Sequence, residues 1–437
     1  MIRLTLINGK LSGRYVSKAA GKWPMYCEIS AAVLSSSSAR PYLNVMPDLA
    51  GRGLRQGGSS MADKNRILGQ KELQERVLDA DLCTGCGACV GLCPYQASYN
   101  DNIVFLHSCD LEAGRCYAFC PRTPTDLEAL RKTLFDERDL TPEIGAVKEF
   151  YITRATDEQV RKNAQHGGTV TALTALAIQE GIIDTAVITE GQENFLPHGV
   201  MAKDPSDIKK RGKSNFVMSP MIAEFNRIAK GEHNKIGVVV TPCQALALAK
   251  MRLKPIATDA NNIDKLKFVI GLFCGWAFSW RKFVDLLRKK TDLDTIIGMD
   301  IPPSKYHAIE VYTKNGTIEI SLDDVTPCIR EACLYCFDMT AEFSDISVGS
   351  ARLPEGWEVA RSWNQVIVRT QIGHELMELA RAKGLLEFRD VPEGNLEKLK
   401  KASMNKKGMA VKNLTEKSGS SDNLLYLNSN DPVFRTL

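Results

Sequence analysis

Hydrophobic residues follow two patterns along the chain from about residue 170 onwards. Short runs rich in Val, Ile and Phe are typical of buried strands, and longer runs with apolar residues three or four positions apart are typical of helices. Strands are expected at 186–189, 235–240, 268–272 and 365–369, and helices at 170–180, 278–290 and 374–383. This alternation of strands and helices predicts an α/β layer architecture.

Other segments add detail to this fold. Residues 309–313 and 317–322 flank Asn315-Gly316, a pair favoured in two-residue hairpin turns, so we expect a β-hairpin and a mixed sheet. The segment 123–137 is expected to form a helix with Thr125 or Asp126 as its N-cap. The Lys-rich stretch 398–412 has the composition of a solvated helix or tail.

The first sixty residues differ from the rest in composition. They contain eight Lys or Arg against two acids, Glu28 and Asp48, together with Ser and Gly runs and no sustained period. This extension is interpreted either as an organelle transit peptide or, preferably, as a stretch that precedes the real start at Met61. Its excess of about +6, set against the whole-chain +4, leaves the remainder near −2, so no basic surface for nucleic acid is expected.

Cysteine spacing carries the most specific chemical information in the chain. Seven of the thirteen cysteines lie between residues 83 and 120, in the order Cys83, Cys86, Cys89, Cys93, Cys109, Cys116 and Cys120. The C-x2-C-x2-C-x3-C-P run is typical of ferredoxins, in which three thiolates bind one cluster and the fourth binds its neighbour. Zinc is the alternative for paired C-x2-C segments, but a zinc ribbon does not end in this way.

A second set of cysteines lies far downstream: Cys243, Cys274, Cys328, Cys333 and Cys336. Cys243 and Cys274 each follow a predicted strand, and strand ends are usual ligand sites in α/β sheets. The alternative is that single buried cysteines act as small hydrophobic residues. A chain of 437 residues with 44% hydrophobic content is unlike a secreted disulfide scaffold, so these thiols are expected to be metal ligands in the cytoplasm. No run of eighteen apolar residues occurs, so no direct membrane span is expected.

A glycine turn precedes the first predicted helix of the large domain. In Gln165-His166-Gly167-Gly168-Thr169 two glycines allow a phosphate to approach free backbone N–H groups at a helix N-terminus. The motif lacks the full G-x-G-x-x-G pattern, so a conventional Rossmann site is not supported, and a plain turn is the simpler interpretation. His166 is either a cofactor neighbour or, preferably, a polar residue satisfied within the protein.

With these segments in place, the chain resembles the family of β-subunits of coenzyme F-420 hydrogenases and dehydrogenases. The matching segments extend from residue 81 to about residue 400: CTGCGACVGLCP, RCYAFCPR, AQHGGTVTALTALAIQEGIIDTAVI, KSNFVMSP, VVVTPCQALAL, VIGLFCGWAF, CLYCFDMTAEFSDISVGS and WNQVIVRTQIGHELMELA. The resemblance implies an iron–sulfur flavoprotein with one FAD and two to three 4Fe-4S clusters. It implies FAD contacts at His166, Gly167, Gly168, Thr169, Thr171, Lys213, Ser214 and Asn215, although Lys213 is also consistent with a surface lysine.

The cysteines are distributed over clusters as follows. The crossed ferredoxin pattern gives Cys83, Cys86, Cys89 and Cys120 to one cluster and leaves Cys93, Cys109 and Cys116 for a second. That second set is one ligand short, which leaves a 3Fe-4S cluster, a ligand such as Asp110 or Glu112, or a thiolate from Cys328. The resemblance assigns a further cluster to Cys243, Cys274, Cys333 and Cys336.

The expected organisation has five parts. They are a basic extension at 1–60, a ferredoxin-like iron–sulfur module at 61–125, a connecting helix at 126–149, a large mixed-sheet α/β flavin domain at 150–400 and a C-terminal tail at 401–437. No catalytic residue is assigned.

Two functions are considered. In the first, the chain exchanges hydride with F-420 or NAD(P)H at its FAD. It then passes single electrons to a hydrogenase, formate dehydrogenase or heterodisulfide-reductase-like subunit, or to a ferredoxin. In the second, the chain is a non-catalytic relay subunit of such a complex, and a free pigment reductase is a less favoured third interpretation.

Overall fold

The computed structural model describes residues 2–7, 10–15 and 66–437, apart from 192–193, 254, 257–261 and 303–305. The chain divides into two compact units, Met1–Gly58 and Ser59–Leu437. The described part of the first unit is a hairpin of β1 (Ile2–Ile7) and β2 (Lys10–Tyr15). Most of the expected extension at 1–60 lies outside the described residues, and so does the predicted start at Met61.

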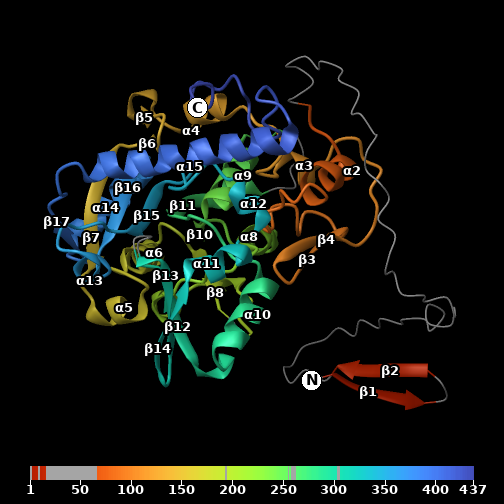
Figure 1. The fold of residues 1–437 in the computed structure, drawn as a ribbon, viewed down its shortest axis with the longest axis horizontal. Coiled ribbons are helices and arrows are strands. Elements are labelled where there is room, and N and C mark those ends of the chain that lie inside the picture. The colour runs from red at the N-terminus through yellow and green to blue at the C-terminus, as the bar shows by residue number, and fades with distance from the viewer. Residues whose placement is uncertain are drawn as a thin grey trace. The chain divides into compact units, whose positions relative to one another are not determined.

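An eight-stranded mixed sheet organises the second unit (Figure 1), in the order β17-β7-β16-β15-β11-β10-β8-β9. Its strands are β7 (Glu149–Ala155), β8 (Thr185–Glu190), β9 (His198–Ala202), β10 (Ile236–Val240), β11 (Leu266–Leu272), β15 (Ile346–Ser350), β16 (Asn364–Val368) and β17 (Leu386–Arg389). The four strands β8, β10, β11 and β15 run parallel, and the flanking strands pair antiparallel. The mixed α/β architecture expected from the sequence is therefore confirmed.

Helices cover both faces of this sheet. They are α5 (Glu158–Asn163), α6 (Thr169–Gln179), α7 (Pro205–Lys210), α8 (Met221–Ile228), α9 (Pro242–Arg252), α14 (Gln371–Ala382) and α15 (Asn395–Ser418). The short helix α13 (Trp357–Ala360) lies between β15 and β16 in the sequence. Ile270 of β11 packs with α6 and α14, whereas the neighbouring Val269 packs with α8 and α9. This alternation follows from the pleat, which turns successive side chains to opposite faces.

The predicted hairpin forms, but not in the large sheet. β13 (Ala308–Thr313) and β14 (Gly316–Ser321) join β12 (Ile296–Asp300) in a separate three-stranded sheet. This sheet packs against α10 (Trp280–Lys290) through residues such as Phe283 and Ile309. The large sheet is mixed because of its own flanking strands, so the inference from the hairpin to a mixed sheet was wrong.

The cysteine-rich module precedes the large sheet. It contains α2 (Gln70–Leu73) continued by a π-helical turn (Gln74–Leu78), the hairpin of β3 (Gln96–Tyr99) and β4 (Asn102–Phe105), and α3 (Arg115–Ala118). The connecting helix α4 (Leu127–Leu134) starts where expected, because the Asp126 side chain accepts a hydrogen bond from the Ala129 N–H. A short pair, β5 (Leu140–Thr141) and β6 (Gly145–Ala146), follows.

The residues after 400 do not form a tail. Helix α15 continues to Ser418 and runs from the β17 side of the sheet towards α12 (Glu331–Leu334) (Figure 1). Beyond it, Leu424, Tyr426 and Phe434 are buried in the same core as the cysteine-rich module. The remaining helix, α11 (Leu322–Val325), follows the three-stranded sheet. No helix among the described ranges has the length and apolar character needed to cross a membrane.

Candidate functional site

One edge of the large sheet gathers most of the predicted site residues. Because β8, β10, β11 and β15 are parallel, their carboxyl ends meet there, and this is the usual ligand-binding edge of α/β sheets. Gly191 follows β8, Cys243 follows β10 as the second residue of α9, and Cys274 follows β11.

The structure brings Cys243, Cys274, Cys333 and Cys336 together at this edge. Burial raises the pKa of Cys274 well above its ordinary value, and the thiols of Cys333, Cys243 and Cys336 raise it further. Burial and then Cys336 raise the pKa of Cys243 to about 11. The Cys333 Sγ accepts a hydrogen bond from the Ala277 N–H at 3.4 Å. We call these four residues the sheet-edge cysteines.

A second group contains Cys83, Cys86, Cys89 and Cys120, here called the module cysteines. Burial raises the pKa of Cys89 well above its ordinary value, and the nearby thiols of Cys83, Cys86 and Cys120 contribute next. The proline-terminated end of the motif thus returns Cys120 to the first three thiols, as the crossed ferredoxin pattern requires.

A third group contains Cys93, Cys109 and Cys116, here called the three-cysteine group. Burial raises the pKa of the Cys116 thiol, and Cys93 and Cys109 are among the neighbours that raise it further. The side chains of Asp110 and Glu112, two of the predicted fourth ligands, are exposed.

The three groups lie in a row. The pKa of Cys86 is raised by burial and then by Cys243, which makes the module cysteines neighbours of the sheet-edge cysteines. The pKa of Cys89 also responds to Cys116, so the three-cysteine group adjoins the other side of the module cysteines. Adjacent cluster sites are what stepwise electron transfer needs.

Cys328 does not join any group. It is buried in the core between α10 and the three-stranded sheet, among Phe278, Phe283 and Val325. Burial raises the pKa of its thiol, and the charged neighbours that affect it are Lys282 and Lys289 rather than other thiols. The assignment of Cys328 as a ligand was therefore wrong, and its role is that of a small hydrophobic residue.

Unsatisfied donors show that the cysteine groups suit an anionic cluster. Within the described ranges, the buried Thr84 Oγ1 and Arg122 Nε have no hydrogen-bond partner. Both residues lie beside cluster cysteines in sequence, and a buried donor without an acceptor costs about 1–3 kcal/mol. Sulfide and thiolate sulfurs of a cluster would supply acceptors.

No three His, Cys, Asp or Glu side chains in the described part of the chain are placed to hold one metal ion. An iron–sulfur cubane puts each thiolate on a different iron. This finding therefore applies to sites for a single metal ion and does not apply to iron–sulfur clusters.

Two buried cations border the module cysteines. Lys250 donates to the carbonyl oxygens of Cys120 at 2.7 Å and Thr123 at 3.2 Å, and burial lowers its pKa to about 8. Arg122 donates to the carbonyl oxygens of Ala332 and Tyr335, near the sheet-edge cysteines. Sequence reasoning missed both, although Arg122 directly follows the Cys120-Pro121 pair.

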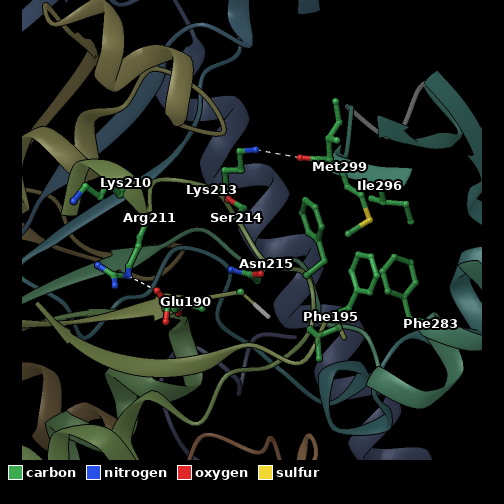
Figure 2. A pocket seen from close by; sticks show the side chains of 16 residues that line it. Glu190, Phe195, Lys210, Arg211, Lys213, Ser214, Asn215, Phe283, Ile296 and Met299 are labelled. Atoms are coloured by element: carbon green, nitrogen blue, oxygen red, sulfur yellow. Dashed lines mark hydrogen bonds and ion pairs between the residues drawn. The ribbon is translucent and has the colours of Figure 1, made fainter. Parts of the chain in front are cut away.

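A pocket of about 400 Å³ opens beyond β8 (Figure 2). Lys213, Ser214 and Asn215, all predicted flavin contacts, line it together with Lys210 and Arg211. Its opposite wall is apolar and contains Phe195, Phe216, Phe283, Ile296 and Met299, none of which was predicted. Arg211 is paired with Glu190, and the Lys213 Nζ donates to the Ile297 carbonyl oxygen at 3.1 Å.

The glycine turn lies at the same sheet edge but does not line this pocket. Gly168 has a φ of +78°, and a Cβ on Gly167 would lie 2.8 Å from the Asn364 Oδ1. The Thr169 hydroxyl is buried and hydrogen-bonded to Thr153. The two glycines thus have a packing reason of their own, and flavin contact at this turn stays a prediction.

The remaining predicted contacts lie around the turn. His166 Nδ1 is 3.2 Å from the Arg361 carbonyl oxygen, and its ring meets Trp357 edge-on. Thr171 is buried, and a Cβ on Gly212 would lie 3.2 Å from its hydroxyl, which places Thr171 beside the segment that enters the pocket.

A single segment, 213–218, links the pocket to the cysteines. Its first five residues line the pocket, and the Phe216 carbonyl accepts the Phe278 N–H at 2.7 Å. Phe278 follows Ala277, the donor to Cys333. At the other end, a Cβ on Gly85 would lie 3.3 Å from Met218. The pocket, the sheet-edge cysteines and the module cysteines are therefore neighbours.

Two family models match the domain that contains this arrangement. They are described as the N-term and the C terminus of the coenzyme F420 hydrogenase/dehydrogenase beta subunit, and they match residues 150–225 and 233–394. Together they cover more than half of the chain. The chain belongs to the family of coenzyme F-420 hydrogenase/dehydrogenase beta subunits.

The family models contain the site residues described above. The N-terminal model includes the glycine turn and Lys213 to Asn215, and the C-terminal model includes all four sheet-edge cysteines. A 4Fe-4S binding domain model matches residues 76–99, which include Cys83, Cys86, Cys89 and Cys93. The chain is thus an oxidoreductase-family subunit with a 4Fe-4S motif.

The chain is similar to named subunits of F-420-linked enzymes and to a chain of a solved hydrogenase complex. The coenzyme F-420 hydrogenase subunit beta of Methanothermobacter thermautotrophicus is 30% identical over 62% of this chain and 95% of its own length. One subunit of the F(420)H(2) dehydrogenase of Methanosarcina mazei is 27% identical over 76% of this chain and 92% of its own. A chain of the F-420-reducing [NiFe] hydrogenase complex from Methanosarcina barkeri superimposes with a TM-score of 0.58 at 29% identity, covering 63% of this chain and 94% of that one.

Proposed function

We propose that this chain is a flavin-bearing electron-transfer subunit. It exchanges hydride with coenzyme F-420 at a bound FAD and passes single electrons through iron–sulfur clusters to a partner redox subunit. The observation that carries the proposal is segment 213–218. Residues 213–217 line the pocket, the Phe216 carbonyl oxygen accepts the N–H of the residue after Ala277, and Met218 packs beside Gly85, between Cys83 and Cys86.

The pocket suits a flavin in its chemistry. Lys210 and Lys213 offer positive charge for phosphate groups, and the aromatic side chains of Phe195, Phe216 and Phe283 offer an apolar wall for a ring system. A bound FAD supplies the conversion between a two-electron hydride carrier and one-electron clusters. The volume of about 400 Å³ suits the ring-bearing part of such a cofactor, and the glycine turn at the same edge is proposed to receive the rest.

The cysteines are proposed to hold clusters in the order in which electrons pass. The sheet-edge cysteines adjoin the pocket, the module cysteines follow, and the three-cysteine group comes last. Buried Arg122 and Lys250 stabilise negative charge on the first two clusters, since opposite charges at short range favour the ionised thiolates.

The names of the relatives point to F-420 as the two-electron coenzyme, and NAD(P)H is the competing donor. Arg211 is already paired with Glu190, so Lys210 and Lys213 are the residues proposed to meet an anionic coenzyme. The partner is proposed to be a hydrogenase, formate dehydrogenase or heterodisulfide-reductase-like subunit.

The test is reduction of the anaerobically purified protein by each coenzyme in turn. Reduced F-420, NADH and NADPH are added separately while the flavin absorbance is followed and bound FAD is quantified in the same sample. Rapid bleaching of the flavin absorbance by reduced F-420 supports the proposal. Bleaching by NADH or NADPH alone would show that a nicotinamide, and not F-420, is the two-electron coenzyme.

Absence of FAD, or no bleaching by any coenzyme while dithionite still reduces the clusters, would overturn hydride exchange. The relay function would then stand in its place. Lys213→Ala should weaken reduction by the coenzyme, while Lys289→Ala on α10, outside the pocket, serves as the control.

A further inference from the structure

Among the residues that the structure describes, no fourth thiol joins the three-cysteine group. Cys93, Cys109 and Cys116 lie together, but Cys328 is in another core and the side chains of Asp110 and Glu112 are exposed. The 4Fe-4S model match ends at residue 99 and includes only Cys93 of the three. Any cluster at this site therefore has three thiolate ligands from the described residues.

A buried amide lies beside two of these thiols instead. Gln96, the first residue of β3, is 5% exposed, and its Oε1 is 3.3 Å from the Cys93 Sγ. The same side chain also lies near the Cys116 thiol. A neutral carboxamide is a much poorer iron ligand than a thiolate, because iron in these clusters is bound by anionic sulfur. Gln96 thus fills the position near Cys93 and Cys116 without replacing the missing ligand.

An unsatisfied cation indicates that an anionic group belongs at this site. Arg115 directly precedes Cys116, and its Nη2 donates to the carbonyl oxygen of Leu92, which directly precedes Cys93, at 2.9 Å. Its Nη1 is buried and has no hydrogen-bond partner in the described ranges. A buried charged donor without an acceptor is costly, so the site is incomplete as a purely protein structure.

We propose that Cys93, Cys109 and Cys116 bind a 3Fe-4S cluster, with Gln96 closing the corner where a fourth iron would need a ligand. Three thiolates can hold three irons of a cuboidal cluster, and a fourth iron without a protein ligand is lost readily. Arg115 then donates to the anionic cluster. The proposal goes beyond the proposed function and depends on it only for the role of the cluster as the last electron carrier in the row.

The cluster type can be tested by electron paramagnetic resonance on the full-length protein. An oxidised 3Fe-4S cluster is paramagnetic, whereas oxidised 4Fe-4S clusters of ferredoxin type are not. The anaerobic protein, incubated with ferrous iron and dithiothreitol to repair damaged four-iron clusters and then gently oxidised, should give about one spin and about eleven irons per chain.

Gln96→Cys is the decisive variant because it supplies the missing thiolate. It should abolish the oxidised-state signal, raise the iron content to about twelve per chain and add a reduced-state four-iron signal. Gln96→Ala should keep the three-iron signal. Cys328→Ser is the matched control and should change neither iron content nor spectrum.

Three results would overturn the proposal: no oxidised-state signal after repair, a signal that persists unchanged in Gln96→Cys, or a signal unaffected by Cys116→Ser. None of these measurements involves the flavin or its coenzyme. A protein that shows the three-iron signal but fails hydride exchange would therefore overturn the proposed function and leave this site standing.

Discussion

Arg122 shows how one side chain can serve two cysteine groups. Its guanidinium donates to Ala332, Tyr335 and Tyr426, which lie beside the sheet-edge cysteines. Burial acts to lower its pKa, but Tyr426 and the thiols of the sheet-edge group raise it, so the group stays charged. A fixed positive charge at this place would favour the reduced, more negative form of a cluster bound at either group.

Arg122→Met should therefore lower the reduction potential of the neighbouring clusters. An effective dielectric constant of about 20 gives roughly 2 kcal/mol for charges about 8 Å apart, which corresponds to about 90 mV for one electron. Redox titration followed by electron paramagnetic resonance measures the shift. Arg288→Met on the exposed surface of α10 is the control, and equal potentials in both variants would contradict this role.

Lys407 is the buried member of a lysine-rich stretch. Its ammonium pairs with Glu342, and both side chains are almost completely buried. Glu342 also lies 3.7 Å from Arg131, which pairs with Asp431 near the C-terminus. This network connects α15, α4 and the end of the chain.

Lys407→Met should destabilise the protein by about 3–5 kcal/mol, because it leaves the Glu342 carboxylate without its closest cation. The free energy of unfolding from denaturant titration is the measurement. Lys412→Met, in the same helix but exposed, should change it by no more than about 0.5 kcal/mol. Similar values for the two variants would show that the buried pair has no special role.

At the scale of elements, the glycine turn sets the entry of the chain into α6. The Ala155 N–H donates to the Gly167 carbonyl oxygen, so the turn is held against the end of β7. Gly168 adopts a left-handed conformation, and a Cβ there would lie 3.0 Å from Val160. The turn therefore needs glycine for both backbone and packing reasons.

Gly168→Ala should destabilise the protein by more than the roughly 1–2 kcal/mol expected for a left-handed alanine alone. Gly181→Ala is the matched control, since Gly181 has a φ of +66° with open space around its Cβ position. The difference between the two unfolding free energies isolates the contact with Val160. FAD content measured in the same samples shows whether the turn also holds the cofactor, and equal destabilisation by both variants would remove the packing argument.

Helix α8 holds the loop that carries the module cysteines. The Asn226 side chain donates to the carbonyl oxygens of Ala88 at 3.2 Å and Val90 at 2.7 Å, and the Ile222 N–H donates to the Cys86 carbonyl oxygen. The loop between Cys86 and Cys93 is thus positioned by a helix of the large domain.

Asn226→Ala should leave these carbonyl oxygens without partners, at about 1–3 kcal/mol for each buried group. We expect faster loss of cluster absorbance in air and lower iron content after purification. Arg227→Ala, the exposed neighbour paired with Glu224, is the control. Unchanged cluster lifetime in Asn226→Ala would mean that the loop holds its shape without α8.

At the scale of the whole molecule, the cysteine-rich module is not an independent domain. Leu73, Phe119 and Leu130 share one core with α8, α9 and the C-terminal residues Tyr426 and Phe434. The predicted divisions at 125, 149 and 400 therefore do not separate independent cores. The core between α10 and the three-stranded sheet is distinct from it.

Removal of iron by an anaerobic chelator should therefore loosen more than the module, because metal binding and folding of such sites are coupled. Amide hydrogen exchange should accelerate in the module, α9 and the segment after Ser418. The three-stranded sheet, with its separate core, should keep its protection. If amide exchange became faster only within residues 66–125, the result would contradict a shared core.

The sequence by itself determined the local structure and the type of chemistry. The strands at β8, β10, β11 and β16 and the helices α6, α10 and α14 lie where periodicity placed them, because the pleat and the helical turn are set within a few residues. The 4Fe-4S motif was likewise readable, since ligands to one cluster can lie within a few turns of chain.

Only the tertiary structure decided which distant residues meet. Cys328 lies apart from the other thiols, and Gln96 lies beside Cys93. Lys407 is buried within a run that looks solvated, and the hairpin belongs to its own sheet. These outcomes depend on packing between segments up to hundreds of residues apart. Burial and pairing of a side chain are properties of its surroundings, which local sequence patterns do not contain.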